Sequence, residues 1–289
     1  MAPHIENHND TPLLLRPPLA TSENKEFICG WGAATVNILV TFPINKIIFR
    51  QMLHNLNTLA AVEQVASEGI FRLYRGVVPP LCQKSVSVSI MFGMYDKCRR
   101  PLLERNVNPF LSKVIAANVA GTIECILVPF ERVQTLLQHE RYHKEVLNMK
   151  HAMNLLWHQH GFAEFYRGLV PVLYRNGPSN ALFFIFRDKA NELFPEPTNF
   201  PSRVVNQFAI GAMIGALCST IFYPCNVLKV HMQSRIGGPF QSVISSIVEI
   251  YLERGSIKAF FRGVHLNYTR SCISWGVINV AYEGLKKIL

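Results

Sequence analysis

The chain has 289 residues, of which 49% are hydrophobic and only 17% carry a charge, yet its formal net charge is +10. Soluble domains contain about 25% charged residues, and a soluble nucleic-acid-binding protein would carry its basic charge on a charge-rich surface, so this composition argues against both. The 7 cysteines are scattered without a CxxC spacing, which argues against the disulfide framework of a secreted protein.

The chain opens with a polar segment, residues 1–22, that contains several prolines and no apolar core. A signal peptide needs such a core, and a mitochondrial transit peptide is rich in arginine. We therefore expect a disordered tail here, with the folded part beginning near residue 25.

Two markers recur three times, at intervals close to one third of the chain. The first is an aromatic residue followed by arginine and glycine, at Arg75-Gly76, Arg167-Gly168 and Arg262-Gly263. The second is a proline that ends an apolar run and opens a polar helical one, at Pro43, Pro129 and Pro224, and we expect a helix kink at each. Self-similarity at a fixed period indicates a repeat architecture. We expect three homologous units, 25–106, 109–197 and 203–289, that together form one domain.

Each unit contains the same succession of predicted helices. An apolar segment comes first, at 27–45, 114–130 and 204–228, and its helix is expected to continue past the proline. A short amphipathic stretch follows at 56–68, 149–158 and 240–252, and then a second apolar segment with a few polar residues at 77–95, 169–186 and 264–282. At about 1.5 Å per residue these helices can cross a bilayer core. The pattern predicts an all-α membrane protein with six spans, and the long uncharged runs disfavour the alternative, a soluble all-helical protein.

Within the third unit, glycines stand four positions apart, at Gly211 and Gly215. This spacing allows close helix packing in a membrane.

The three copies of a proline-led and an Arg-Gly-led stretch resemble the mitochondrial carrier family over residues 25–289. The family pattern is Pro-x-[Asp/Glu]-x-x-[Lys/Arg], followed by an acid-Gly and a base-Gly stretch. The resemblance implies a six-helix barrel with threefold pseudosymmetry, three short matrix helices, and alternating access about a central site in the inner mitochondrial membrane. It also implies a monomeric transporter that has no cofactor, binds no nucleic acid and contacts membrane lipids, with cardiolipin at the matrix helices.

In this family an acid of each odd-numbered helix pairs with a base of the next one and closes the matrix side. The resemblance places Asn45, Glu131 and Asn226 at the acid positions and Ile48, Gln134 and Lys229 at the base positions. It therefore implies one matrix ion pair, Glu131–Lys229. Gln138 and Gln233 match the glutamine that braces such pairs, whereas the first unit has Met52. One hypothesis is that the matrix gate is the weaker gate; the alternative is that hydrogen bonds from side chains such as Asn45 and Gln134 compensate.

On the cytoplasmic side, the same alignment places Asp96, Asp188 and Glu283 at acid positions and Arg99, Asn191 and Lys286 at base positions. Two ion pairs are implied there, Asp188–Lys286 and Glu283–Arg99. Exposed pairs contribute only about 0–1 kcal/mol each, and pairs in a dehydrated, closed gate contribute more.

Ionisable residues inside spanning helices are costly, so they are candidates for function. Gln83, Arg175 and Arg270 follow the three Arg-Gly glycines at equal spacing, a level at which the family contacts its substrate, and Lys84 and Asn176 come one residue later. Glu124 precedes Pro129 by a rise of about 7.5 Å, so it could reach a similar depth. Three cations and one anion around a cavity suit an anionic ligand with phosphate or carboxylate oxygens.

NAD⁺ would use all four charges, with its pyrophosphate on Arg175, Arg270 and Lys84 and its nicotinamidium near Glu124. An internal ion pair from Glu124 to one of the cations is a second, compatible interpretation. The strings FPINKIIFRQ, FERVQTLLQ, YRGLVPVLYRNG and FRGVHLNYTRS also resemble the NAD⁺ carrier subgroup, which implies import of NAD⁺ into the matrix as a transported substrate.

The alternatives are a carrier of CoA, ADP or a flavin nucleotide, and a membrane protein that binds anionic lipid without transport. The buried polar ring argues against the last of these.

Three other features of the sequence do not change this functional prediction. His139 and His143 have the helical spacing of metal ligands but no third ligand, so we expect no metal site. No glycine-rich phosphate loop follows a strand and no nucleophile–base pair is present, so we do not expect an enzyme. Phe183, Phe184 and Trp275 could line the cavity and stack on a ring, but packing against lipid or neighbouring helices is the favoured interpretation.

Overall fold

A computed structural model describes residues 23–193 and 200–288, and within this part of the chain every regular element is a helix. Each third of the chain repeats one succession: a long helix, short helices, and a second long helix. The first third comprises α1 (Glu23–His54), α2 (Thr58–Ser67), α3 (Ile70–Leu73) and α4 (Val78–Glu104). The second comprises α5 (Pro109–Glu124), a 3-10 turn (Cys125–Leu127), α6 (Val128–Gln138), α7 (Met149–Leu155) and α8 (Leu169–Leu193). The third comprises α9 (Phe200–Ile221), α10 (Tyr223–Gln233), α11 (Val243–Arg254) and α12 (Val264–Ile288).

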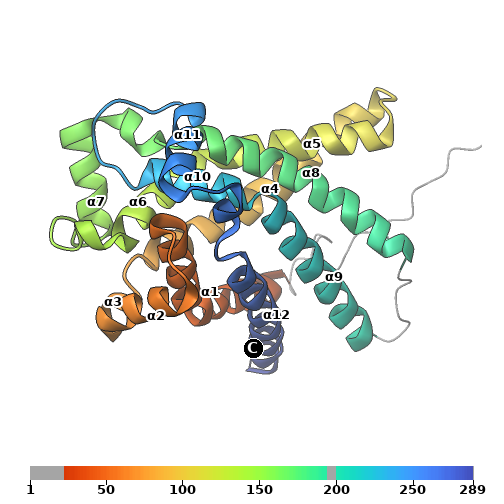
Figure 1. The fold of residues 1–289 in the computed structure, drawn as a ribbon. Coiled ribbons are helices and arrows are strands. Elements are labelled where there is room, and N and C mark those ends of the chain that lie inside the picture. Colours follow the sequence, from red (N-terminus) through yellow and green to blue (C-terminus); the bar gives the residue numbers. More distant parts are fainter. Residues whose placement is uncertain (1–22, 194–199, 289) are drawn as a thin grey trace, which may run out of the picture.

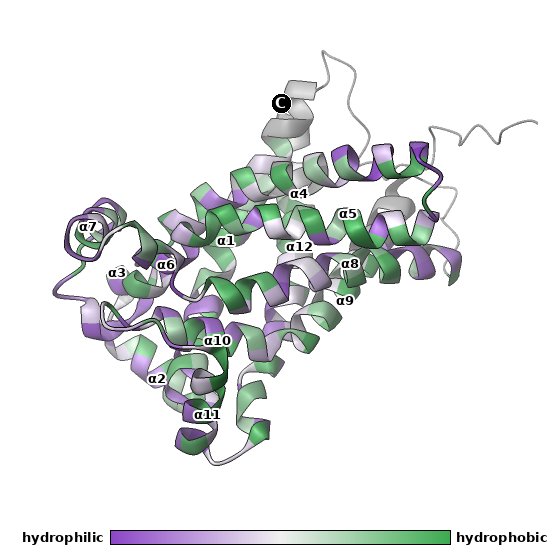
Figure 2. Ribbon diagram, turned by 90° about the horizontal axis from the view of Figure 1, so that it is seen from above, coloured by the Kyte–Doolittle hydropathy of each residue, from purple (hydrophilic) through white to green (hydrophobic). Residues whose placement is uncertain are grey.

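The long helices form a ring in which each contacts the next, and the ring closes where α12 packs against α1. The short helices α2, α3, α7 and α11 gather at one end of this ring, and the long helices spread apart toward the other end (Figure 1). Apolar residues are frequent along the long helices, and hydrophilic residues occur at both ends of the ring, among the short helices and at the opposite ends of the long helices (Figure 2). The arrangement is the all-helical threefold barrel that the sequence predicts.

Two helices of the described chain, Cys29–His54 and Pro109–Gln138, are by themselves long and apolar enough to cross a membrane. A third span results if Ala209–Ile221 and Tyr223–Gln233, which meet at 59°, count as one bent helix. The remaining long helices α4, α8 and α12 have 27, 25 and 25 residues, enough to cross a bilayer core of about 30 Å. Their hydropathy is lower because they carry the polar residues of the predicted central site.

The three prolines do not act alike. Before Pro129 and Pro224 the helix is interrupted, and each proline lies in the first turn of the helix that follows, where its missing N–H is no loss. Helix α1, in contrast, runs through Pro43 without a break. A proline inside a helix removes one hydrogen bond of the ladder, and the neighbouring bonds suffice to keep α1 continuous.

The recurring Arg-Gly pairs join each unit to the next around the ring. Gly76 packs against Leu137 and Gln138 of α6, Gly168 packs against Gln233 of α10, and Gly263 packs against Gln51 of α1 and Tyr223 of α10. All three glycines have positive φ, +87°, +77° and +94°, a conformation that other residues rarely adopt. Glycine is therefore required twice over here, by the backbone turn and by the neighbouring helix.

The arginine of each pair also reaches into the next unit, where it donates hydrogen bonds to backbone carbonyls of the segment that follows α1, α6 or α10. Arg75 donates to the carbonyl of Val146, and Arg262 donates to that of Asn55. Arg167 donates to the carbonyls of Gly237 and Gly238 at 2.9 and 2.8 Å. These carbonyls belong to residues outside the helices, so they have no partner in a helical ladder, and the arginines supply charged donors for them. Each of the three Arg-Gly pairs thus fixes one unit to the next, and we call this set of contacts a clasp.

The close packing that the spacing of Gly211 and Gly215 allows is not used in this structure, since a Cβ atom at either position would meet nothing within 4 Å. Close packing occurs instead between α5 and α8. A Cβ atom on Gly121 would lie 2.7 Å from the backbone of Asn176, and one on Gly177 would lie 2.8 Å from Asn118. These glycines lie on facing helices and not four apart on one helix, so the spacing rule does not detect them.

Replacing Gly168 by alanine tests the clasp. The new Cβ atom would lie 2.9 Å from Cγ of Gln233, and φ is +77°. Gly161 of the same unit is the matched control, because its φ is +82° but nothing lies within 4 Å. We expect Gly161→Ala to lower the free energy of unfolding by about 1–2 kcal/mol from backbone strain alone, and Gly168→Ala to lower it further. Thermal unfolding in detergent measures both, and equal losses would contradict the close packing.

Candidate functional site

One carboxylate joins four helices at the narrow end of the ring. Glu131, in the first turn of α6, accepts hydrogen bonds at Oε1 from Gln83 Nε2 of α4 (3.0 Å) and Arg175 Nη2 of α8 (2.9 Å). Its Oε2 accepts from Lys229 Nζ of α10 at 3.0 Å. The residue is only 8% exposed, so the two cations and the amide compensate for the cost of burying its charge.

Arg175 extends this network. Its Nη1 donates to Asn226 Oδ1 at 2.8 Å, and its Nε donates to Asn176 Oδ1 at 2.9 Å. The sequence analysis assigned Gln83, Arg175 and Asn176 to the substrate site and Glu131 and Asn226 to the matrix gate. In the structure the two sets meet in one hydrogen-bonded cluster.

Other residues of the predicted matrix gate take no part in that cluster. Gln233 Oε1 accepts from Thr135 Oγ1 at 3.1 Å, while Gln138 packs against Gly76. Within the described chain neither glutamine side chain is hydrogen-bonded to the side chain of Glu131 or Lys229 in this conformation. Asn45 and Gln134 likewise make no side-chain hydrogen bond to another helix within the described residues.

A second group of charges lies apart from Glu131. Glu124 of α5 accepts a hydrogen bond from Ser87 Oγ of α4. Arg270 of α12 donates to Asn267 Oδ1 through Nη2 at 2.9 Å and through Nε at 3.3 Å. The side chain of Lys84 on α4 is accessible at its surface but enclosed by the surrounding helices, with Glu124 attracting its charge and Arg270 repelling it. Within the described chain none of these three charges is held in an ion pair, so the interpretation of Glu124 as half of an internal ion pair does not apply to this conformation.

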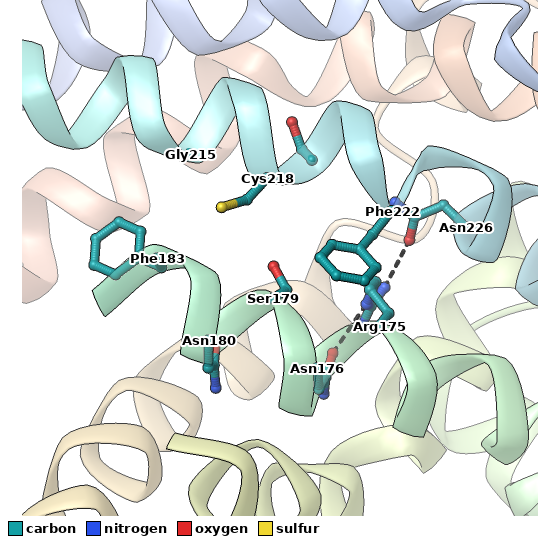
Figure 3. Close-up of a pocket in the computed structure, with 10 residues that line it drawn as sticks. Arg175, Asn176, Ser179, Asn180, Phe183, Gly215, Cys218, Phe222 and Asn226 are labelled. Atoms are coloured by element: carbon teal, nitrogen blue, oxygen red, sulfur yellow. Dashed lines mark hydrogen bonds between the residues drawn. The ribbon is translucent and has the colours of Figure 1, made fainter. Parts of the chain in front are cut away.

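A cavity of about 250 Å³ lies between α8 and α9, next to Arg175. Figure 3 shows Phe183 and Phe222 at its two ends, with Ser179 and Cys218 between them. The position of Phe222 follows from the interruption between α9 and α10, since this residue is the one between the two helices. The sequence did not single out Ser179, Cys218 or Phe222, because neither charge nor repeat marks them.

At the cytoplasmic end the structure shows one ion pair that the alignment does not include. Asp188 of α8 pairs with Lys113 of the adjacent helix α5. Asp96 is exposed and Arg99 is half-buried. The side chains of Asn191, Glu283 and Lys286, and also of Trp275, lie outside the described residues, so the pairs Asp188–Lys286 and Glu283–Arg99 stay predictions. Phe184 is buried and stacks on Tyr95 with ring centroids 4.2 Å apart, as packing predicts.

The two spaced histidines follow α6 directly. Burial lowers the pKa of both His139 and His143 to about 4, so both are neutral at pH 7. His139 Nδ1 accepts a hydrogen bond from the backbone N–H of Arg141. No cluster of three or more His, Cys, Asp or Glu side chains suited to a metal ion is found in the described chain.

Comparison with known proteins covers nearly the whole chain. The family described as "Mitochondrial carrier protein" matches residues 22–106, 106–198 and 200–289. The chain is 44% identical to the mitochondrial nicotinamide adenine dinucleotide transporter SLC25A51 of Mus musculus, over 95% of this chain and 97% of that protein. It is 43% identical to the mitochondrial nicotinamide adenine dinucleotide transporter SLC25A52 of Homo sapiens over the same shares. Solute carrier family 25 member 53 of Homo sapiens is 31% identical over 91% of this chain and 88% of that protein.

Removing the Glu131 charge tests how much the buried cluster contributes. Glu131→Gln leaves Arg175 and Lys229 without their carboxylate, and breaking a buried pair typically costs about 3–5 kcal/mol. We expect a clear fall in the thermal unfolding temperature in detergent. Asp188→Asn is the control, because the pair of Asp188 with Lys113 is partly exposed and should be worth at most about 1 kcal/mol. Equal, small effects of the two changes would contradict the importance of the cluster.

Proposed function

This chain belongs to the mitochondrial carrier family, and on that premise we propose that it transports NAD⁺ into the mitochondrial matrix by alternating access. It is a multi-pass protein of the inner mitochondrial membrane and a transporter, not an enzyme. The relatives named above as nicotinamide adenine dinucleotide transporters support the choice of substrate. Contacts with lipids such as cardiolipin and the monomeric state stay predictions.

The observation that carries the proposal is the separation of the charges into two groups. Lys84 and Arg270 are cations without a carboxylate partner in the described chain, and Glu124 is a carboxylate held only by the hydroxyl of Ser87. NAD⁺ combines a pyrophosphate with a positively charged nicotinamide ring. The pyrophosphate suits the cations, and the nicotinamidium suits Glu124, so one ligand satisfies both signs of charge.

Arg175 links substrate binding to the matrix gate. In this conformation its guanidinium is bonded to Glu131 and Asn226, at the end of the ring that carries the short helices. We infer that the pyrophosphate competes with Glu131 for Arg175. A ligand can drive a conformational change only through interactions that differ between the two states, and this exchange of partners provides such a difference.

Carriers of CoA, ADP or a flavin nucleotide are the competing assignment. Each of these ligands has phosphates for the arginines but lacks a fixed positive ring for Glu124. A requirement for the Glu124 carboxylate therefore distinguishes transport of NAD⁺ from transport of CoA, ADP or a flavin nucleotide.

Uptake of labelled NAD⁺ into proteoliposomes tests the proposal. We expect Arg270→Ala to lower uptake at least about tenfold, because a charge-assisted hydrogen bond contributes about 1.5–3 kcal/mol, and Glu124→Gln to lower it by a similar factor. Lys144→Ala, which changes an exposed cation outside the site, should leave uptake unchanged. Wild-type protein that moves CoA or ADP but not NAD⁺ would contradict the substrate assignment, and normal uptake by Glu124→Gln would contradict the role of the carboxylate.

A further inference from the structure

We propose that Arg50 and Glu140 form an additional gate pair, which joins the first and second units while the carrier is closed to the matrix and separates when it opens. The pair lies outside the positions that the family pattern assigns to the gate. This inference rests on the alternating access of the proposed function, because only a protein that changes between two states has contacts that must break in each cycle.

The family pattern leaves the boundary between the first and second units without an ion pair. The acid of the first unit and the base of the second would meet there, but the two positions hold Asn45 and Gln134. Between the second and third units, in contrast, Glu131 and Lys229 pair at 3.0 Å. Closure of the ring against the matrix is therefore unequal if these positions are the whole gate.

Glu140 brings a carboxylate to this boundary from the turn that follows α6. Its Oε2 accepts a hydrogen bond from Arg50 Nη1, and its Oε1 lies 2.7 Å from Nε2 of His54. Gln64 Nε2 of α2 also donates to Oε2, at 3.1 Å. Each of these three partners belongs to the first unit, whereas Glu140 belongs to the second, so the carboxylate is bound across the boundary.

Charge balance explains why Arg50 needs this partner. The side chains of Lys46 and Arg50 are both 0% exposed, and both pair with Glu68 of the same unit. One carboxylate cannot neutralise two buried cations, and an unbalanced buried charge is costly. The second carboxylate of this cluster comes from Glu140, so the first unit depends on the second for the balance of its buried charge.

The turn that carries Glu140 is held firmly by the second unit. It is a 3-10 turn, Glu140–Tyr142, that begins two residues after the end of α6. Tyr142 is only 8% exposed and packs in a hydrophobic core with Leu136 of α6 and with Val146. Because this packing ties the turn to α6, a movement of α6 away from α1 carries Glu140 with it and pulls the carboxylate from Arg50.

The pairs at this end of the ring differ in whether opening can affect them. Several lie within one unit and can move with it; they are Lys46–Glu68, Arg132–Glu164 and Arg235–Glu249. Arg50–Glu140 and Glu131–Lys229 join different units. An interaction biases a conformational equilibrium only if it differs between the two states, so the pairs that join different units are the ones that oppose opening.

The rate at which a buried thiol reacts measures opening. Thr135 is 3% exposed and donates to Gln233 across the boundary with the third unit, so Thr135→Cys reacts with a water-soluble maleimide when the matrix side opens. In this background we expect Glu140→Gln to speed labelling of residue 135 at least about fivefold, because the open state no longer has to break the pair. Glu145→Gln, which removes an exposed acid from the same segment, should change the rate less than about twofold.

Cys29 serves as the control for unfolding, because it is 2% exposed and lies in α1 far along the chain from the gate residues. Mass spectrometry resolves its labelling from that of residue 135. We expect the reaction of Cys29 to stay unchanged in Glu140→Gln. Equal acceleration at both thiols would show a general loss of structure and would overturn the gate role of the pair.

Exchange of charges separates a gate pair from a merely structural role of Glu140. Glu140→Lys places a cation beside Arg50 and should speed labelling of residue 135 more than Glu140→Gln does. Adding His54→Glu returns a carboxylate to the boundary from the side of the first unit, and the rate should then fall to within about twofold of the Thr135→Cys protein. A double variant that reacts as fast as Glu140→Lys would overturn the pair.

The labelling rates do not depend on which solute is carried, so the two proposals can fail separately. Unchanged labelling in both Glu140→Gln and Glu140→Lys would overturn the additional gate pair and leave NAD⁺ transport standing. Wild-type protein that labels as expected but takes up no NAD⁺ would overturn the substrate assignment and support the pair.

Discussion

The burial of one negative charge organises the centre of this protein. The Glu131 carboxylate is almost inaccessible to water, and it is held by Arg175, Lys229 and Gln83 from three other helices. A buried carboxylate without partners would be costly, so the four helices must stay together at this level as long as the charge is enclosed. Around it, three Arg-Gly clasps fix each unit to the next, and they need glycine because a neighbouring helix occupies the place of a side chain. The narrow end of the ring is thus held by a charge cluster inside and by backbone contacts outside.

Arg175 is the point at which this closure and the proposed transport meet. It contacts the gate acid, the gate amide Asn226 and the cavity between α8 and α9 at once. A phosphate group that reaches the cavity offers the guanidinium an alternative to Glu131. Lys84, Glu124 and Arg270 are not engaged in ion pairs within the described chain, so they can meet a ligand without first breaking such contacts. Binding and gate opening are then coupled because Arg175 exchanges Glu131 for phosphate. The free energy of this coupling is the difference between the Arg175–phosphate and the Arg175–Glu131 interaction.

Sequence reasoning predicted the features that repeat. The Arg-Gly and proline markers predicted the three units and the order of the helices. The family resemblance implied the pair of Glu131 with Lys229, whose Oε2 and Nζ atoms lie 3.0 Å apart in the structure. It did not predict that Arg175 and Gln83 bind Glu131, because a register gives the level of a residue along the barrel but not the reach of its side chain. The spacing of Gly211 and Gly215 allows tight packing, but the close approach lies at Gly121 and Gly177, since a spacing within one helix does not say which face meets a neighbour. Asp188 also pairs with Lys113 of the adjacent helix α5, and the repeat does not encode this contact.

The central claim is that the transported anion and Glu131 compete for Arg175. Isothermal titration calorimetry of NAD⁺ binding to the purified protein in detergent, with wild type beside Glu131→Gln, tests it most directly. If the two compete, removing the Glu131 charge frees the guanidinium, and the Kd for NAD⁺ falls severalfold even though the protein is less stable. An unchanged or higher Kd in Glu131→Gln would show that Arg175 is not shared between the gate and the ligand, and would contradict the account.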